Sequence, residues 1–176
     1  MHRHIGIYAG TFDPIHAGHL AFAQEAQQFF GLDQVVLLPE AEPRNKPGVA
    51  PLSGRMAHVQ REIAAFPGLL AMQLAARRFT VHDALPELYA TFGREGLVFL
   101  FGSDVAPSFV HWPGIEYLLR RHVLAIGLRT QDTEAHLEQT YRTPIRWAAL
   151  RTAIPHLSST QIRRQLSMAD VSVIRP

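Results

Sequence analysis

Residues 5–20 read IGIYAGTFDPIHAGHL, and within them an apolar run passes through a glycine turn into an amphipathic segment. The run 5–9 has the length and apolar character of a buried strand, and residues 17–30 carry apolar side chains at helical spacing. The sequence therefore predicts a strand that turns directly into a helix. Unpaired amides and the positive dipole end at such a helix start favour an anion, so we interpret the turn as a phosphate-handling site.

Four residues of this turn are candidates for contact with a phosphate. Gly10 and Gly18 remove side chains where a phosphate would approach closely, and His16 and His19 stand three apart, so both can face one anion from the first helical turn. Glycine-rich turns are also common in α/β proteins without this role, and the glycines alone decide nothing. The spacing is neither the dinucleotide fingerprint nor a Gly-Lys-Ser/Thr nucleotide loop.

The composition predicts a single folded domain over residues 1–176. Hydrophobic residues make up 47% and charged residues 18% of the chain, which is typical of a well-buried core. The net charge is only +2 and the basic residues are scattered, which argues against a nucleic-acid partner. No apolar run is long enough to span a membrane, no signal-peptide core precedes the first strand, and there are no cysteines. We therefore expect a cytoplasmic protein, and the sequence is compatible with a homo-oligomer.

Apolar runs and amphipathic segments alternate along the rest of the chain, which predicts an α/β fold with a mainly parallel sheet and helices on both faces. Ser53 is the expected N-cap of a helix over 55–66, and Pro86 is expected to interrupt or shift the helix that opens at Thr80. The buried stripe of the helix 55–66 is expected to be Met56, Val59, Ile63 and Phe66. The other expected strands are 34–39, 69–74, 97–101, 122–128 and, at an edge, 145–150, and the other expected helices are 114–121 and 133–141.

The loop 40–51 leaves the carboxyl end of the second strand, where parallel sheets bind ligands. It is rich in proline and contains Lys46, the only lysine of the chain. A chain that otherwise uses arginine but keeps one lysine suggests a compact point charge at that position. Taken alone, the lysine is better explained as a solvated surface charge.

A second polar cluster, LSSTQIR, occupies residues 157–163 near the other end of the chain. Ser159 and Thr160 supply hydroxyl donors, and Arg163 offers a planar fork one turn later, so the cluster can hold the distal phosphates of a triphosphate. Taken alone, Ser158 or Ser159 is better explained as a helix N-cap.

The strand 97–101 ends in a third candidate site. Gly102 and Asp104 follow it, and an acid beside a glycine at a strand end can accept hydrogen bonds from ribose hydroxyls at close range. Capping of the next helix by Ser103 or Asp104 explains these residues equally well. Trp112 follows, and a tryptophan is usually part of the core.

The segments GTFDP and HAGH, followed late in the chain by SSTQIR, resemble the signatures of the adenylyltransferases of the nucleotidyltransferase superfamily, and the nicotinate-mononucleotide branch fits best. The resemblance covers nearly the whole chain and implies a Rossmann-like nucleotidyltransferase fold. Residues 167–176 resemble the approach to a final helix that relatives possess, and we expect this chain to lack that helix. Phosphopantetheine adenylyltransferases usually carry threonine where this chain has His16, and cytidylyltransferases end in a different Ser/Thr signature.

The resemblance also implies roles for individual residues. Trp112 would stack on the pyridine ring of the acceptor, and Val81 stands where that branch has a threonine, so only a backbone contact carries over. The implied catalytic set is His16, His19, Lys46 and Arg163. The implied ATP-binding set is Gly10, Thr11, Phe12, Gly18, Gly102, Asp104, Arg129, Ser158, Ser159 and Thr160, and the implied acceptor-binding set is Val81, Asp83 and Trp112.

The implied reaction moves AMP from ATP, with Mg²⁺, to the phosphate of nicotinate mononucleotide and releases pyrophosphate. No side-chain nucleophile and no protein-bound metal are implied. Two alternatives remain at this point: transfer to phosphopantetheine or another acceptor, and a non-catalytic nucleotide-binding protein.

Overall fold

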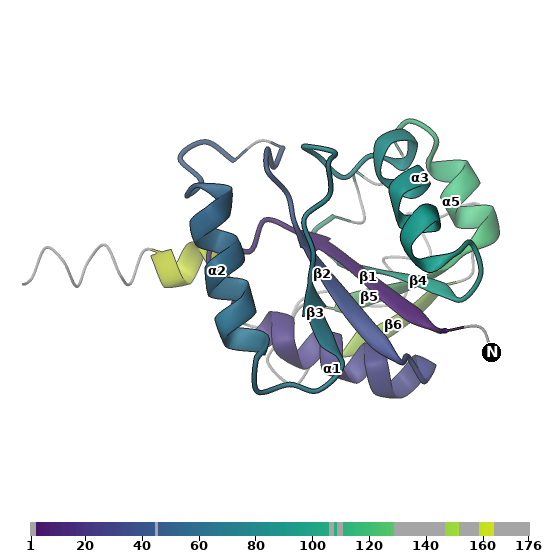
Figure 1. Cartoon of the computed structure of the whole chain (residues 1–176), viewed down its shortest axis with the longest axis horizontal. Helices are drawn as coiled ribbons and strands as arrows, with labels where there is room; N and C mark the ends of the chain where they lie inside the picture. The colour runs from purple at the N-terminus through teal and green to yellow at the C-terminus, as the bar shows by residue number, and fades with distance from the viewer. Residues whose placement is uncertain are drawn as a thin grey trace, which may run out of the picture.

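A computed structural model of the chain describes residues 3–44, 46–105, 108, 111–128, 147–151 and 159–163. In that part of the chain, the strands form one sheet of six, in the order β3-β2-β1-β4-β5-β6, and every neighbouring pair is parallel (Figure 1). The strands are β1 (Ile5–Gly10), β2 (Gln34–Pro39), β3 (Leu69–Ala71), β4 (Leu97–Gly102), β5 (Val123–Leu128) and β6 (Trp147–Arg151). The helices are α1 (Ala17–Phe30), α2 (Leu52–Ile63), α3 (Val81–Phe92) and α5 (Ile115–Arg121). The expected α/β class with a mainly parallel sheet is confirmed.

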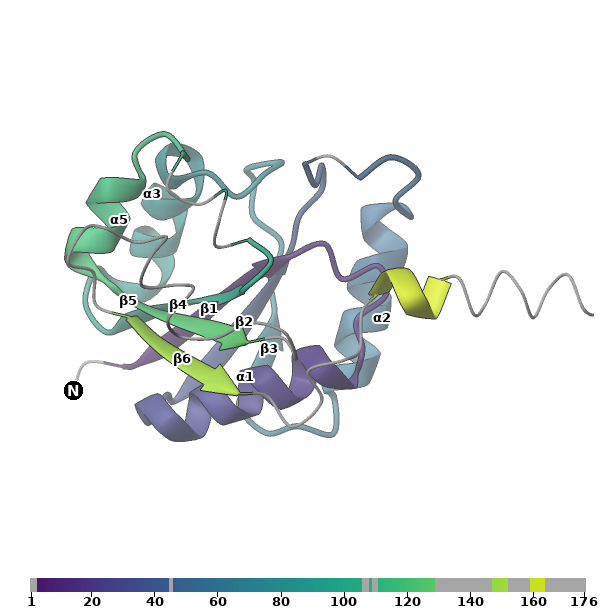
Figure 2. The ribbon, with the colours of Figure 1, turned by 180° about the vertical axis from the view of Figure 1, so that it is seen from behind.

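Helices cover both faces of the sheet, as the view from behind also shows (Figure 2). Side chains alternate across each strand, so Ile5 and Ile7 pack in the core beneath α3 and α5, while Tyr8 packs with α1 and α2. The strands read as continuous apolar runs because both faces are buried. The strands β1 and β4 are parallel neighbours at the centre of the sheet. The turns that follow them therefore lie next to each other, at the carboxyl ends of the strands.

The helix α1 has the bounds that its apolar spacing predicts. His16 is its N-cap residue, and Gly31 ends it in the left-handed conformation with φ of 59°. The Leu32 N–H then returns to the Gln27 carbonyl at 2.9 Å, so the helix closes on a glycine cap and the chain enters β2 directly.

The start of α2 differs from the prediction. The helix begins at Leu52 with Pro51 in the N-cap position, so Ser53 lies inside the first turn and is not the cap. The fixed φ of proline suits a helix start, and the Pro51 carbonyl accepts from the Arg55 N–H at 3.2 Å. Of the predicted stripe, Val59 and Ile63 are buried as expected, and Arg55 is buried in addition. Met56 and Phe66 are only half-buried.

Two further elements differ in detail. The helix α3 runs through Pro86 without interruption, because the proline removes only one helical hydrogen bond while Ala84 and Leu88 remain packed in the core. The strand β3 is three residues long and not six. After it, the Ala75 N–H donates to the Glu87 carboxylate at 2.9 Å, so the chain turns from the sheet towards α3.

Several predictions concern residues that the structure does not describe. They are the helix 133–141, the residues Arg129 and Ser158, and the segment after Arg163. Within the described ranges, no helix is long and apolar enough to cross a membrane.

Candidate active site

The turn between β1 and α1 is built over the ring of Phe12. Phe12 has a positive φ of 47°, is 1% exposed, and lies edge-on to Tyr8 with 5.3 Å between ring centroids. A Cβ atom on Gly10 would lie 3.0 Å from the Phe12 ring, so glycine allows the strand end to pass closely over it. The Phe12 side chain therefore belongs to the core, and only its backbone is available to a ligand. Gly18 lies on the first turn of α1.

His16 and His19 lie side by side at the start of α1, as their spacing predicts. Their ring centroids are 3.7 Å apart. The His16 backbone N–H donates to Nδ1 of His19 at 3.2 Å. Because Nδ1 accepts this bond, the proton of the neutral His19 ring is on Nε2. The turn thus fixes His19 as a hydrogen-bond donor through Nε2.

The only lysine of the chain reaches this turn from the loop 40–51. Lys46 Nζ donates to Thr11 Oγ1 at 3.0 Å, across a sequence separation of 35 residues. The same loop is anchored at its start, where the Glu40 N–H donates to the Gly10 carbonyl at 3.0 Å. The predicted proximity of Lys46 to the glycine turn is therefore present in the structure.

A buried arginine that the sequence reasoning missed lies beneath both segments. Arg55 is 3% exposed, and its guanidinium donates to the carbonyls of Thr11 at 2.6 Å, Glu40 at 2.8 Å and Ala50 at 2.8 Å. Burial lowers the pKa of Arg55, and the carboxylates of Asp13 and Glu40 oppose that shift. The sequence spacing could have identified it. Arg55 precedes Val59 and Ile63 at intervals of four residues, so it lies on the face of the helix that is otherwise apolar and buried.

The early and late signature segments meet at Asp13 and Pro14. Ser159 Oγ donates to the Pro14 carbonyl at 2.9 Å, and Arg163 donates to the Asp13 carbonyl. Arg163 also lies 3.7 Å from the Asp13 carboxylate, and it donates to Thr160 Oγ1 at 3.3 Å. The short helix that contains these residues lies beside α2 in both views (Figures 1 and 2). The structure therefore brings the late signature to the early one.

Asp13 is the second residue that the sequence reasoning missed. The residue is 8% exposed, and besides contacting Arg163 its carboxylate accepts from the Ala50 N–H at 3.4 Å. The carboxylate thus contacts the end of the loop that carries Lys46. A buried acid in a signature segment was the signal that could have identified it.

Gly102 and Asp104 lie at the same edge of the sheet, at the end of β4. The pairing of β1 with β4 extends to Tyr8 and Leu100, so Gly102 ends level with the glycine turn. A Cβ atom on Gly102 would lie 2.5 Å from Oδ1 of Asp104, which means that the carboxylate folds back closely over the glycine. The Ser103 N–H donates to the Gly127 carbonyl at 3.0 Å and holds this turn.

Trp112 is half-buried and packs on the core below the same edge. Its ring lies edge-on to Phe101, with 6.0 Å between centroids. The guanidinium of Arg44, from the loop 40–51, lies over the ring 4.9 Å from its centroid. Arg44 is a third residue that was not predicted as part of the site, and it covers one face of the tryptophan that the resemblance assigns to the acceptor.

Val81 and Asp83 both serve the start of α3. Val81 is 4% exposed, so any contact it makes with a ligand comes from its backbone. The Asp83 carboxylate accepts from the Thr80 hydroxyl at 2.6 Å, and the Asp83 N–H donates to Thr80 Oγ1 at 3.1 Å. These bonds form a reciprocal helix cap.

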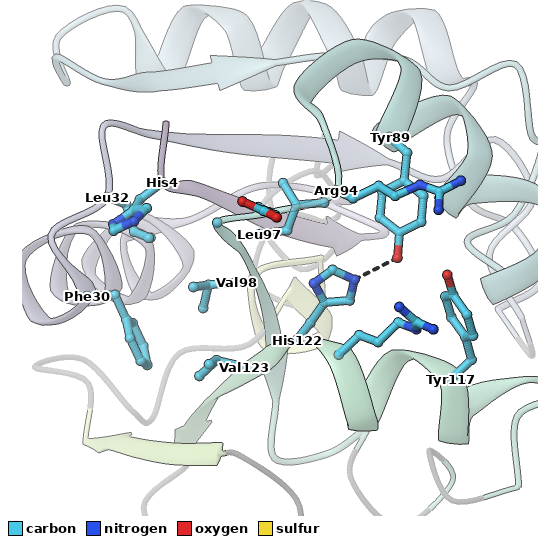
Figure 3. Close-up of a pocket in the computed structure, with 13 residues that line it drawn as sticks. His4, Phe30, Leu32, Tyr89, Arg94, Leu97, Val98, Tyr117, His122 and Val123 are labelled. Carbon is cyan, nitrogen blue, oxygen red and sulfur yellow. Dashed lines mark hydrogen bonds between the residues drawn. The ribbon is translucent and has the colours of Figure 1, made fainter. Parts of the chain in front are cut away.

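A cavity of about 540 Å³ lies at the opposite end of the sheet, among residues that precede or begin β1, β4 and β5 (Figure 3). The Tyr89 hydroxyl bonds to Nε2 of His122 at 2.7 Å within it. Burial lowers the pKa of His122, and burial together with Tyr117 raises the pKa of Tyr89 to about 12. None of the predicted site residues lines this cavity.

The fold and the site together define a nucleotidyltransferase: a parallel sheet whose first turn carries paired histidines, a lysine from the next loop and a late Ser-Thr-Arg helix. A family model described as cytidylyltransferase-like matches residues 7–165. The chain is 33% identical over 176 residues to a "Probable nicotinate-nucleotide adenylyltransferase" of Solibacter usitatus, covering 95% of this chain and 89% of the relative. A relative of the same name from Neisseria gonorrhoeae is 31% identical over 184 residues, covering 97% of this chain and 90% of the relative.

Solved structures agree with the fold. The "Plasmodium falciparum nicotinic acid mononucleotide adenylyltransferase complexed with NaAD" has a TM-score of 0.77 at 16% identity, covering 93% of this chain and 83% of that one. The same parasite enzyme complexed with APC has a TM-score of 0.75. The chain belongs to the nicotinate-nucleotide adenylyltransferase family of the cytidylyltransferase-like proteins.

Proposed function

We propose that this chain transfers the adenylyl group of ATP to the phosphate of nicotinate mononucleotide. An oxygen of the acceptor phosphate attacks the α-phosphorus of ATP in line, and the bond from that phosphorus to the oxygen bridging the α- and β-phosphates breaks. Pyrophosphate leaves with the bonding electrons. Catalysis then consists of positioning the two substrates and stabilising the charge that develops between them.

The observation that carries the proposal is the meeting of the early and late signature segments around one turn. Ser159 bonds to Pro14 and Arg163 to Asp13, while Lys46 bonds to Thr11. This arrangement gathers Lys46 and Arg163 beside the amide-rich start of α1. A triphosphate is the anion that such a set of donors fits, because each end of the set can hold a different phosphate.

Each catalytic residue has a distinct role in this proposal. His19 donates through Nε2 to the α-phosphate region as negative charge develops, because its Nδ1 is already engaged by the His16 backbone. His16 lies against it and completes the donor pair. Lys46 and Arg163 hold the phosphates, and Thr11 orients Lys46. Asp104 faces the ribose, and Trp112 forms the wall for the pyridine ring.

Magnesium enters the proposal with ATP. The turn carries one carboxylate, Asp13, which contacts Arg163 and the Ala50 N–H. The histidines, Lys46 and Arg163 present nitrogen atoms and not the oxygen-rich set that Mg²⁺ prefers. In the part of the chain that the structure describes, no group of three or more His, Cys, Asp or Glu residues could hold a metal. The ion therefore arrives on the phosphates as part of the substrate, where it supplies charge neutralisation.

The proposal is tested by pyrophosphate release from protein, ATP and Mg²⁺ with each of three acceptors: nicotinate mononucleotide, nicotinamide mononucleotide and phosphopantetheine. We expect release with nicotinate mononucleotide. Release with phosphopantetheine alone would replace the acceptor. Binding of ATP without release from any acceptor would show a nucleotide-binding protein that does not turn over.

A further inference from the structure

Arg55 lies where a helix on the sheet face touches two separate segments of the active site. It occupies the first turn of α2 and is 3% exposed. Arginine is rarely buried to this extent unless its donors are engaged. Here the burial is matched by bonds from Nε and both terminal nitrogens.

The acceptors of those bonds come from both segments that hold the phosphate-binding side chains. One terminal nitrogen bonds to the Thr11 carbonyl in the turn after β1, and the other bonds to the Glu40 carbonyl where the next loop starts. The Nε atom bonds to the Ala50 carbonyl where that loop ends. One rigid guanidinium thus fixes both ends of the loop that carries Lys46 and the turn that Lys46 contacts.

The charge of Arg55 is balanced within the same assembly. The carboxylates of Asp13 and Glu40 act on it, and both are themselves held in place. Asp13 contacts Arg163 and Ala50, and Glu40 accepts from the Phe79 N–H at 2.8 Å. A buried charge with several fixed partners is costly to disturb, so the geometry it imposes is stiff.

We propose that Arg55 is a positioning residue, which sets Lys46 against the Thr11 turn and so determines how tightly the phosphates of ATP are held in the reactive arrangement. This inference rests on the proposed function. Arg55 acts through Lys46, because its bonds reach the backbone of the loop and the turn. Its planar fork addresses three carbonyls in fixed directions, which the flexible ammonium of a lysine does not reproduce.

The test is a double-mutant cycle between Arg55→Lys and Lys46→Ala, measured as kcat/KM for ATP. In the wild-type background, Lys46→Ala removes a charged donor and is expected to lower kcat/KM roughly tenfold to a hundredfold. In the Arg55→Lys background, Lys46 is already displaced, so the same change is expected to cost less than about threefold. Isothermal calorimetry of ATP binding is measured on all four proteins, so that the coupling is also read without turnover.

Arg61→Lys serves as the matched control, because Arg61 is on the same helix with a side chain that is 69% exposed. Its kcat/KM should stay within about twofold of the wild type, as is usual for exposed surface substitutions. Circular dichroism establishes the temperature range in which each variant is folded, and Arg55→Gln replaces Arg55→Lys if the latter does not fold.

The outcomes separate the inference from the function on which it rests. Equal effects of Lys46→Ala in both backgrounds would overturn the positioning role, and so would the failure of both Arg55 variants to fold, because Arg55 would then be a structural residue alone. A wild-type protein that binds ATP but releases no pyrophosphate with any acceptor would refute the proposed reaction, and coupling in the calorimetry would still decide the role of Arg55.

Discussion

The two ends of the sheet use buried polar groups in opposite ways. At the amino end, Tyr89 and His122 bond to each other, and no residue of the signatures lines the cavity around them. At the carboxyl end, Arg55 and Asp13 bond to the backbone of loops, and those loops carry Lys46 and the histidine pair. The buried polar pair at the amino end supports no predicted site residue, whereas the buried polar residues at the carboxyl end hold segments whose side chains can contact a ligand. The difference supports the proposal that the active site lies at the carboxyl end, where open parallel sheets usually bind their ligands.

The largest effect is expected for His19→Ala. Removing one donor that acts on developing charge costs on the order of 10²–10³ in kcat. The fold should persist, because α1 keeps its glycine cap at Gly31 and its buried residues Leu20, Phe22, Ala23 and Ala26, and loses only one bond at its start. Steady-state pyrophosphate release measures kcat. The matched substitution at the other end is His4→Ala, which alters an exposed histidine that lines the amino-end cavity and should leave kcat within about twofold, as is usual for exposed surface substitutions. Equal losses in the two variants would remove the distinction between the ends.

A smaller effect is expected for Arg163→Ala. A hydrogen bond to a charged group contributes about 1.5–3 kcal/mol, so the KM for ATP should rise roughly tenfold to a hundredfold. The KM for the acceptor should change less, because Arg163 lies beside Asp13 and the start of α1. Arg120→Ala is the control, since Arg120 is exposed and pairs with Glu116 on α5. An unchanged KM for ATP would show that Arg163 only ties the two ends of the chain together.

A still smaller effect is expected for Trp112→Ala, and it should fall on the acceptor. Aromatic stacking contributes about 0.5–1.5 kcal/mol, so the KM for nicotinate mononucleotide should rise roughly twofold to tenfold while the KM for ATP stays constant. Tyr117→Ala is the corresponding change at the amino end, because Tyr117 is 40% exposed there. A rise in the KM for ATP instead would place the tryptophan against the adenylyl donor.

The fold was predictable because its strands are buried on both faces. Continuous apolar runs at 5–9, 34–39 and 97–101 mark such strands, and the amphipathic segments between them fix the parallel connections. The predictions were wrong where a preference of the local sequence for a helix start or break was overridden by tertiary packing. Ser53 is a better cap by propensity, yet Pro51 begins α2, and Pro86 does not break α3 because the helix remains anchored by its buried residues.

The site was predictable only in part, for a related reason. His16, His19, Ser159 and Arg163 belong to the signatures, and Lys46 is the only lysine of the chain. The structure gathers all five at one turn. Their catalytic roles stay predictions. Arg55, Asp13 and Arg44 act through contacts with residues far away in sequence. Local patterns mark Arg55 and Asp13 as unusual positions, but they do not show which distant groups these residues contact. Arg129 and Ser158 lie outside the described residues and remain untested.

The smallest effect is expected at the amino end, where changes to Tyr89 and His122 should alter stability and not turnover. Burial lowers the pKa of His122 below its usual value of about 6.5, so the folded protein binds fewer protons than the unfolded chain once the pH falls below that value. Stability is therefore fully present above about pH 6.5 and is lost as the pH falls towards the folded pKa. The pKa of Tyr89 is raised to about 12, so the contribution of Tyr89 to stability is present below about pH 10 and is lost as the pH rises towards 12.

Chemical denaturation of the wild type and of Tyr89→Phe should show a difference in the free energy of unfolding of about 1 kcal/mol near pH 8, the usual contribution of one hydrogen bond, with kcat unchanged. In His122→Gln, the fall in stability between pH 7.5 and 5.5 should be smaller than in the wild type. A loss of turnover in Tyr89→Phe, with stability unaffected, would mean that the two ends of the sheet are coupled and that the amino end also takes part in function.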